Sequence, residues 1–252
     1  MNDNAEMMIK AAQLRSKLGE DGNSPVDIFA LAQNIDKLTL VFYPMGQNLS
    51  GMCIKGKNGK SVIAVNSSMS LGRQRFTLAH EFYHLFFDAG MISICAKTWE
   101  TNKEIEKNAD MFASYFLMPP AELESRAAGY ASKRAGGKLD IQDIIRIEQY
   151  FGVSHQAAVT RLKDTPYIDP AEADLIFRTS ARPIAEKAGY TADLYQPSRP
   201  GRQYRTYGYY INQAEELMKR ELVSTGKYEE LLLDAFREDL VYGLEESGDI
   251  VD

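Results

Sequence analysis

The first fifth of the chain changes from helical to strand-like spacing of its hydrophobic residues. Residues 5–18 carry apolar side chains three and four positions apart, which predicts an amphipathic helix. A second helix is predicted through VDIFALAQNI, with Ser24 as its N-cap and Pro25 in its first turn. The branched and aromatic residues of 38–44 then predict a strand.

The central part of the chain combines a hairpin pattern with two strongly apolar helices. A β-hairpin is predicted over 49–66, because Asn58-Gly59 is a favourable two-residue turn between β-branched segments. The pattern of 67–87 is helical. A further helix is predicted over 102–117, and it ends before two consecutive prolines, since proline disfavours helical geometry in the residue before it.

Residues 139–164 have the pattern of two helices joined by a short turn at 151–153, with Ser154 capping the second helix. This pattern is typical of a DNA-reading helix-turn-helix. The alternative is a helical hairpin that covers the core. The absence of a basic face there favours the hairpin, because DNA-binding modules carry clustered Lys and Arg.

The C-terminal third has a weaker pattern. Residues 204–211 alternate like a strand, and two helices are predicted over 212–224 and 227–242. A domain boundary is expected near 165–170, where proline and acidic residues interrupt the periodicity.

Composition narrows the range of functions. The chain has 252 residues and a net charge of −6, which gives no general attraction to nucleic acid. Its two cysteines, Cys53 and Cys95, are too few for a disulfide framework and are predicted to be reduced packing residues. The sequence shows neither a signal peptide nor an apolar run of membrane-spanning length. A cytoplasmic protein without membrane contact is therefore expected.

Two of the three histidines lie in one apolar stretch, FTLAHEFYHLFF, as His80 and His84 with Glu81 between them. Residues four apart share one face of a helix, so both imidazoles can bind one metal ion. Glu81 points about 100° away and can act as a general base on a water held at the metal. This is the HExxH arrangement of zinc peptidases, although a short motif also arises by chance.

A catalytic zinc site needs a third protein ligand and keeps one open position. Glu106 is the best candidate, because Glu106 and Asp110 share one helical face that also carries small alanines. Glu106 would supply the metal-binding carboxylate, and Asp110 would accept a hydrogen bond from the far nitrogen of a ligand histidine. Glu104 and Glu100 are rival ligands, and a solvated surface carboxylate is the alternative for Glu106.

These motifs together resemble the ImmA/IrrE family of metallopeptidases. The resemblance is carried by RFTLAHEFYHLFF and EKNADMFASYFLMP, and YFGVSHQAAVTRL resembles the helical hairpin that usually follows. It covers about residues 25–165. It implies an α+β fold, in which a zincin-like domain over 1–165 packs helices, including the hairpin 139–163, on a short, mostly antiparallel sheet of three strands. Residues 166–252 would form a C-terminal, mainly helical α+β extension or subdomain.

The resemblance also implies a function. Zn²⁺ would bind His80, His84 and Glu106, and Glu81 would be the catalytic base. The implied activity is a narrow-specificity zinc endopeptidase of bacteria or their mobile elements. It would cleave or inactivate a helix-turn-helix repressor or antitoxin-like partner that is encoded nearby as a separate chain. The alternatives are a zincin-fold regulator that sequesters its partner without cleavage, and a DNA-binding regulator that uses 139–163.

Three further residues, Tyr83, Tyr115 and His155, could take part in the site or have a purely structural role. Tyr83, one turn from His80, is a candidate donor to the oxyanion of the reaction, and packing is its alternative. Tyr115 has the same two readings. His155 is expected to be a surface residue, because no histidine or carboxylate at metal-ligand spacing accompanies it.

Overall fold

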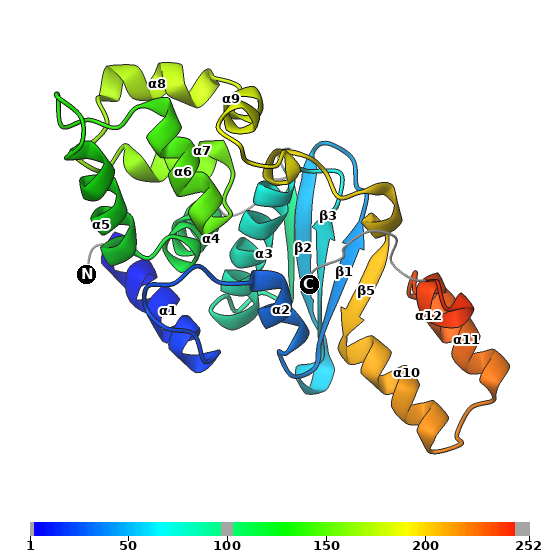
Figure 1. Cartoon of the computed structure of the whole chain (residues 1–252). Helices are drawn as coiled ribbons and strands as arrows, with labels where there is room; N and C mark the ends of the chain where they lie inside the picture. Colours follow the sequence, from blue (N-terminus) through cyan, green and yellow to red (C-terminus); the bar gives the residue numbers. More distant parts are fainter. Residues whose placement is uncertain (1–2, 97–102, 245–252) are drawn as a thin grey trace.

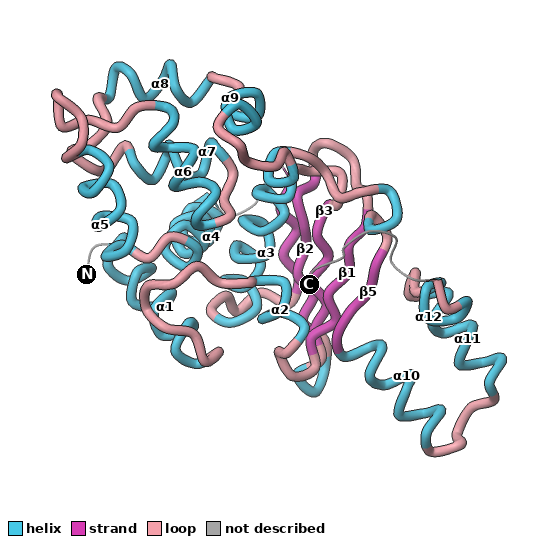
Figure 2. The backbone as a smooth tube through the Cα atoms, in the orientation of Figure 1, coloured by secondary structure: helices cyan, strands magenta, loops and turns pink. Residues whose placement is uncertain are grey.

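The computed structural model describes residues 3–96 and 103–244. Within them, a five-stranded sheet lies between a larger helical region, α1–α9, and a smaller helical projection, α10–α12 (Figures 1 and 2). The strands are β1 Leu38–Tyr43, β2 Leu49–Lys55, β3 Ser61–Asn66, β4 Ile92–Ala96 and β5 Arg205–Gly208. Their order is β4-β2-β3-β1-β5. Only β1 and β3 pair in parallel, so the sheet is mostly antiparallel and the predicted α+β class is confirmed.

The predicted hairpin forms as β2 and β3. Its turn is a short 3₁₀ segment, η1 Lys57–Gly59, in which Asn58 and Gly59 both have positive φ values, 61° and 77°. Strand β4 was not predicted, because its five residues form a short edge strand and Ile92 is 62% exposed. With β4 and β5 the sheet exceeds the three strands that the family resemblance implied.

Strand β5 is shorter than the predicted strand 204–211. It ends at Gly208, where φ is +81° and a Cβ atom would lie 2.5 Å from the carbonyl oxygen of Leu38. A glycine is required at such a position, because any side chain would collide with the neighbouring strand. The chain turns there directly into helix α10, Tyr209–Lys219.

Three helices, α1 Asp3–Lys17, α3 Leu71–Phe86 and α4 Lys103–Leu117, pack together beside the sheet, and α3 contacts β2 and β3 directly. Phe82 of α3 meets Phe116 of α4 edge-on, which anchors the two helices to each other. Arg15 of α1 is 2% exposed and donates hydrogen bonds to the carbonyl oxygens of Phe116 (2.7 Å), Asp21 (2.8 Å) and Ser24 (2.5 Å). These bonds tie the C-terminal end of α4 to the N-terminal segment.

Helix α2, Ile28–Gln33, is shorter than predicted. Asp27 caps it by accepting hydrogen bonds from the backbone N–H groups of Phe29 and Ala30. The Ser24 hydroxyl instead donates to Asp21, so the predicted Ser24 cap is wrong.

The remaining helices of the larger region are α5 Pro120–Ala131, α6 Ile141–Phe151, α7 His155–Leu162, α8 Pro170–Arg178 and α9 Ala181–Lys187. The turn between α6 and α7 uses Gly152 at φ +65°, and Ser154 caps α7 as the pattern indicated. The apolar face of this pair is buried in the main core, through Ile144, Ile147, Phe151, Ala158, Val159 and Leu162. The helical pair thus packs on the core, as the hairpin alternative described.

The prediction for His155 is wrong, because its side chain is buried. Its Nδ1 lies 2.5 Å from Oε1 of Glu148, and its Nε2 lies 2.7 Å from the carbonyl oxygen of Ile176. Glu148 is fully buried and also accepts a hydrogen bond from the Tyr195 hydroxyl. This polar group joins α6 to α7 and α8. Sequence spacing could not show it, because its members come from separate elements.

The C-terminal part contains short 3₁₀ segments, η2 Asp193–Tyr195 and η3 Pro200–Arg202, before β5, and α10, α11 Thr225–Asp234 and α12 Glu238–Tyr242 after it. The single helix predicted over 227–242 is broken before α12, where Phe236 has φ +58°. Strand β5 pairs with β1, so this part contributes to the main sheet. The division at residue 165 stays a prediction. None of the helices within 3–96 and 103–244 has the length and apolar character needed to cross a bilayer.

Candidate metal centre

Helix α3 places both motif histidines and the glutamate inside the protein. The exposed fractions are 6% for His80, 0% for Glu81 and 2% for His84. Leu78 and Phe82, on the other side of the helix, belong to the hydrophobic core. Burial of two imidazoles and a carboxylate is unfavourable unless a charge or hydrogen bond compensates it, so this helix face requires a partner.

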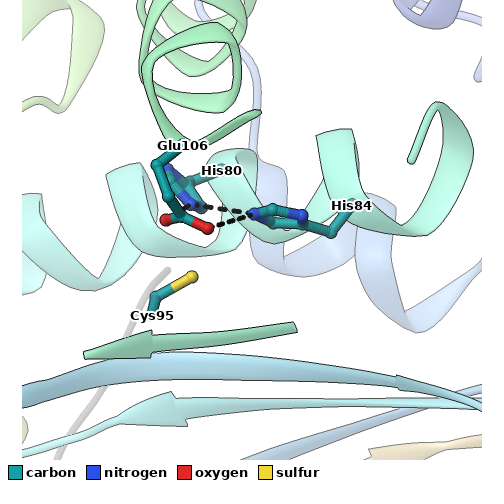
Figure 3. Close-up of side chains that lie close together, drawn as sticks. All are labelled: His80, His84, Cys95 and Glu106. Atoms are coloured by element: carbon teal, nitrogen blue, oxygen red, sulfur yellow. Dashed lines mark hydrogen bonds and ion pairs between the residues drawn. The ribbon is translucent and has the colours of Figure 1, made fainter. Parts of the chain in front are cut away.

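Helix α4 supplies that partner as Glu106 (Figure 3). The two Nε2 atoms of His80 and His84 lie 3.1 Å apart. Oxygens of Glu106 lie 3.3 Å from the first and 3.6 Å from the second. Bonds of about 2.0–2.1 Å to a tetrahedral zinc ion place ligand atoms about 3.3–3.4 Å apart, so the three side chains fit such an ion. The rival Glu104 is exposed, and Glu100 lies outside the described residues.

Two aspartates orient the imidazoles. Oδ1 of Asp110 lies 2.8 Å from Nδ1 of His80, and Oδ2 of Asp88 lies 3.0 Å from Nδ1 of His84. Each Nδ1–H can therefore donate to a carboxylate, which leaves both Nε2 lone pairs for a metal. Sequence reasoning placed Asp110 in this position and missed Asp88. Its spacing of four residues from His84 is the signal that could have found it.

Lysine 55 holds the end of α3 against the sheet. Its Nζ donates to the carbonyl oxygen of His84 at 2.9 Å and to that of Asp88. The cation thus stands at the C-terminal end of the helix, where it also complements the helix dipole. Strand β2 is in this way fixed to the segment that carries His84 and Asp88.

Glu81 has the environment expected of a general base. Both of its carboxylate oxygens are buried and have no hydrogen-bond partner within the described residues. Burial raises the pKa of this carboxyl to about 7, although the nearby His80 opposes the rise. Room for the carboxylate exists because residue 51 is glycine. A Cβ atom there would lie 3.2 Å from Oε1 of Glu81.

The two histidines have opposite pKa shifts without a metal. Burial alone would lower the pKa of His80, but contacts with Asp110, Cys95 and Glu106 raise it well above its ordinary value. The pKa of His84 is lowered, mainly by burial, against the pull of Asp88. A metal needs both rings neutral, so metal binding competes with protonation of His80.

A fourth donor, Cys95, joins the cluster from strand β4. One ligand atom from each of His80, His84, Cys95 and Glu106 can be chosen so that all four lie within 4.8 Å of one another. Burial raises the pKa of the Cys95 thiol to about 12 in the metal-free structure. Both cysteines are reduced, as predicted, and Cys53 is a core residue. Cys95 was predicted only to pack, because the sequence pattern did not reveal β4.

A cleft of about 780 Å³ opens onto this cluster. Its walls come from α3, α4, β4 and α7, and Arg161 of α7 is one of the lining residues. Tyr115 lines the cleft, and the Arg161 guanidinium stacks on its ring at 4.4 Å. Tyr83 is not among the lining residues. It packs between Phe87 and Phe112, which favours its packing alternative over a role at the oxyanion.

Comparison with known proteins adds two findings. Residues 38–163 match the Peptidase_M78 family, described as the IrrE N-terminal-like domain. The chain is also similar to the radiation response metalloprotease IrrE of Deinococcus deserti, with 36% identity over 102 residues. That alignment covers 38% of this chain and 34% of the relative, so the chain matches about a third of that protein's length. The family match includes all four donors of the cluster.

Proposed function

Because the chain belongs to the Peptidase_M78 family of IrrE-like metallopeptidases, we propose that it is a zinc-dependent endopeptidase of narrow specificity that cleaves or inactivates a partner transcriptional repressor. One observation carries the chemical part of this proposal. Two imidazole nitrogens and a carboxylate have the mutual distances of a tetrahedral zinc site, and an unpartnered, buried carboxylate lies beside them.

His80, His84 and Glu106 would hold the metal, as in the HExxH peptidases that use a glutamate as third ligand. A zinc ion held there would lower the pKa of a water molecule and polarise a peptide carbonyl group. Glu81 would accept a proton from the attacking water and deliver it to the leaving amine. Its buried position beside the three ligands suits both proton transfers, because a general base must lie within hydrogen-bond reach of the proton that it accepts.

The surroundings of the site suit an extended peptide. Strand β4 ends the sheet in the described part of the chain, so one of its edges is available for pairing with a peptide backbone. The cleft continues past α4 to α7, whose side chains would then contact the peptide beyond the scissile bond. Contacts with the residues that line this cleft would restrict which peptides can bind, which is consistent with narrow specificity.

The proposed partner is a helix-turn-helix repressor or antitoxin-like protein encoded nearby, and the reaction would take place in the cytoplasm. The family membership supports this choice of partner. Direct DNA binding by this chain is not proposed. The net charge of −6 gives no general attraction to nucleic acid.

The test is to incubate the zinc-loaded chain with the neighbouring repressor and to identify products by mass spectrometry. Glu81→Gln keeps the shape of the side chain and removes the base, so it should abolish cleavage while zinc stays bound. Glu104→Ala, an exposed residue of α4, is the matched control and should cleave normally. If Glu81→Gln still relieves repression without cleavage, sequestration replaces proteolysis as the function.

A further inference from the structure

We propose that Cys95 is a fourth protein ligand of the metal and that the resting site is therefore closed to water. This inference rests on the proposed function only in requiring that the cluster binds zinc. It assigns to the thiol a role that neither the family match nor the relative provides. It also predicts that the isolated chain is a latent enzyme.

The first argument is the position of Cys95. His80 and His84 approach from α3 and Glu106 from α4, whereas Cys95 approaches from the sheet (Figure 3). A tetrahedral ion with three ligands on two helices has its fourth position on another side, and β4 places a sulfur within 4.8 Å of the other donors. A zinc–sulfur bond of about 2.3 Å requires about 3.6 Å between these atoms, so metal binding would draw Cys95 inward by about 1 Å.

The second argument is the register of the sheet. Cys95 pairs with Gly51 of β2, and the missing side chain of Gly51 leaves room for Glu81 on the same side. The sulfur lies within 4.8 Å of the ligand nitrogens of His80 and His84. As a fourth ligand, Cys95 would take the coordination position that an attacking water needs.

An independent sign that a cation belongs here comes from Glu81. Its side chain is fully buried, and neither of its oxygens has a hydrogen-bond partner among the described residues. A buried, unpartnered carboxylate is costly unless a positive charge lies near it. A divalent ion at the cluster supplies positive charge, but Glu106 and a Cys95 thiolate would balance both of its charges, so this observation supports a metal here and not a particular fourth ligand.

The chemistry of the donors suits a closed site. Thiolate, imidazole and carboxylate are all zinc ligands, and sites with four protein ligands are usually structural, whereas catalytic sites keep one position for water. Cys95 would lose its thiol proton when it binds the metal. That proton would pass to solvent; for catalysis the metal–sulfur bond would have to break, a water would take the position, and the thiolate would take a proton back from solvent. No oxidation is involved.

The other cysteine provides a matched control. Cys53 lies two residues along β2 from Gly51, is 1% exposed and belongs to the hydrophobic core. Among the described residues Cys95 supplies the sulfur of the donor cluster, and Cys53 is not part of it. Removing the Cys53 thiol should therefore change packing without changing the metal's ligands.

Cobalt(II) substitution of the full chain tests the proposal without relying on activity. The wild type and Cys53→Ala should show a thiolate-to-cobalt charge-transfer band in the near ultraviolet, and Cys95→Ala and Cys95→Ser should lose it. The Cys95 variants should also release metal to a chelator more readily and cleave a peptide or the repressor faster. Circular dichroism of both Cys95 variants checks that they fold.

Each outcome decides a separate claim. Bound cobalt without the band in the wild type would overturn the Cys95 assignment and leave the three-ligand peptidase site intact. A band that persists in Cys95→Ala would also overturn it. Failure of the wild type to bind cobalt or zinc would overturn the proposed function, and with it any role of Cys95 at a metal.

Discussion

Replacing Gly51 with alanine tests how closely the catalytic helix lies on the sheet. The new Cβ atom would lie 2.6 Å from Cγ2 of Thr77 and 2.9 Å from the carbonyl oxygen of Ala64. Thr77 is buried in α3 and is β-branched, so it has little rotamer freedom. Ala64 belongs to β3, which is paired with β2 and β1. Neither neighbour can move alone, so α3 and β2 must separate.

The expected cost follows from these contacts. Overpacking of a core by one methyl group typically costs about 1–3 kcal/mol. Replacing a strand glycine by alanine recovers about 0.5–1 kcal/mol, because the unfolded chain loses conformational freedom. We therefore expect Gly51→Ala to lower the free energy of unfolding by about 1 kcal/mol, the difference between the midpoints of these two ranges. Catalysis should also fall, since the methyl group would lie 3.2 Å from Oε1 of Glu81.

Urea unfolding of the metal-free chain, followed by circular dichroism, measures the stability change directly. Gly129→Ala is the control, because a Cβ atom at Gly129, within α5, meets nothing within 4 Å. That variant should be more stable by about 0.5–1 kcal/mol. If Gly51→Ala is as stable as the wild type or gains stability as Gly129→Ala does, α3 does not lie against β2 as described.

Three other predictions concern polar side chains that hold a metal ligand or a neighbouring helix in place. Asp110→Ala should weaken zinc binding about 10–100-fold in a chelator competition, because Nδ1 of His80 loses its hydrogen-bond acceptor. Unchanged zinc affinity would show that Asp110 does not orient His80 for the metal. Arg15→Met should lower the free energy of unfolding by about 1–3 kcal/mol in urea titrations, since it leaves buried carbonyl oxygens without donors. An unchanged free energy of unfolding would contradict this role of Arg15. Burial opposes the charge on His155, but the Glu148 carboxylate outweighs it and raises the pKa of the imidazole. The stability of the wild type relative to His155→Gln should thus be greatest below about pH 6.5 and decrease as pH rises through the raised pKa; a difference independent of pH would refute the ion pair.

The parts of the site that depend on local spacing could be predicted from the sequence. His80, Glu81 and His84 are brought together by one helix, and Glu106 and Asp110 share a face of another. Helical periodicity fixes both arrangements before any tertiary contact forms. The structure adds that these two helices pack face to face, which spacing alone cannot establish.

The parts that depend on tertiary contacts could not be predicted. Cys95 reaches the site because the short edge strand β4 pairs with β2, and a strand of five residues carries too little pattern to be predicted. His155 was misplaced for a similar reason, since the carboxylate that stabilises it lies on α6 and its second acceptor on α8. In both cases the deciding partner lies on a different helix or strand.

The zinc content of the purified chain tests the central claim most directly. Mass spectrometry after a mild chelator wash should find about one zinc per chain in the wild type and in Glu104→Ala. His84→Ala and Glu106→Ala should lose the zinc or retain far less of it, because each removes a donor from the cluster. Absence of zinc from the wild type even after reconstitution, or full occupancy in both ligand variants, would contradict a metallopeptidase site at this position.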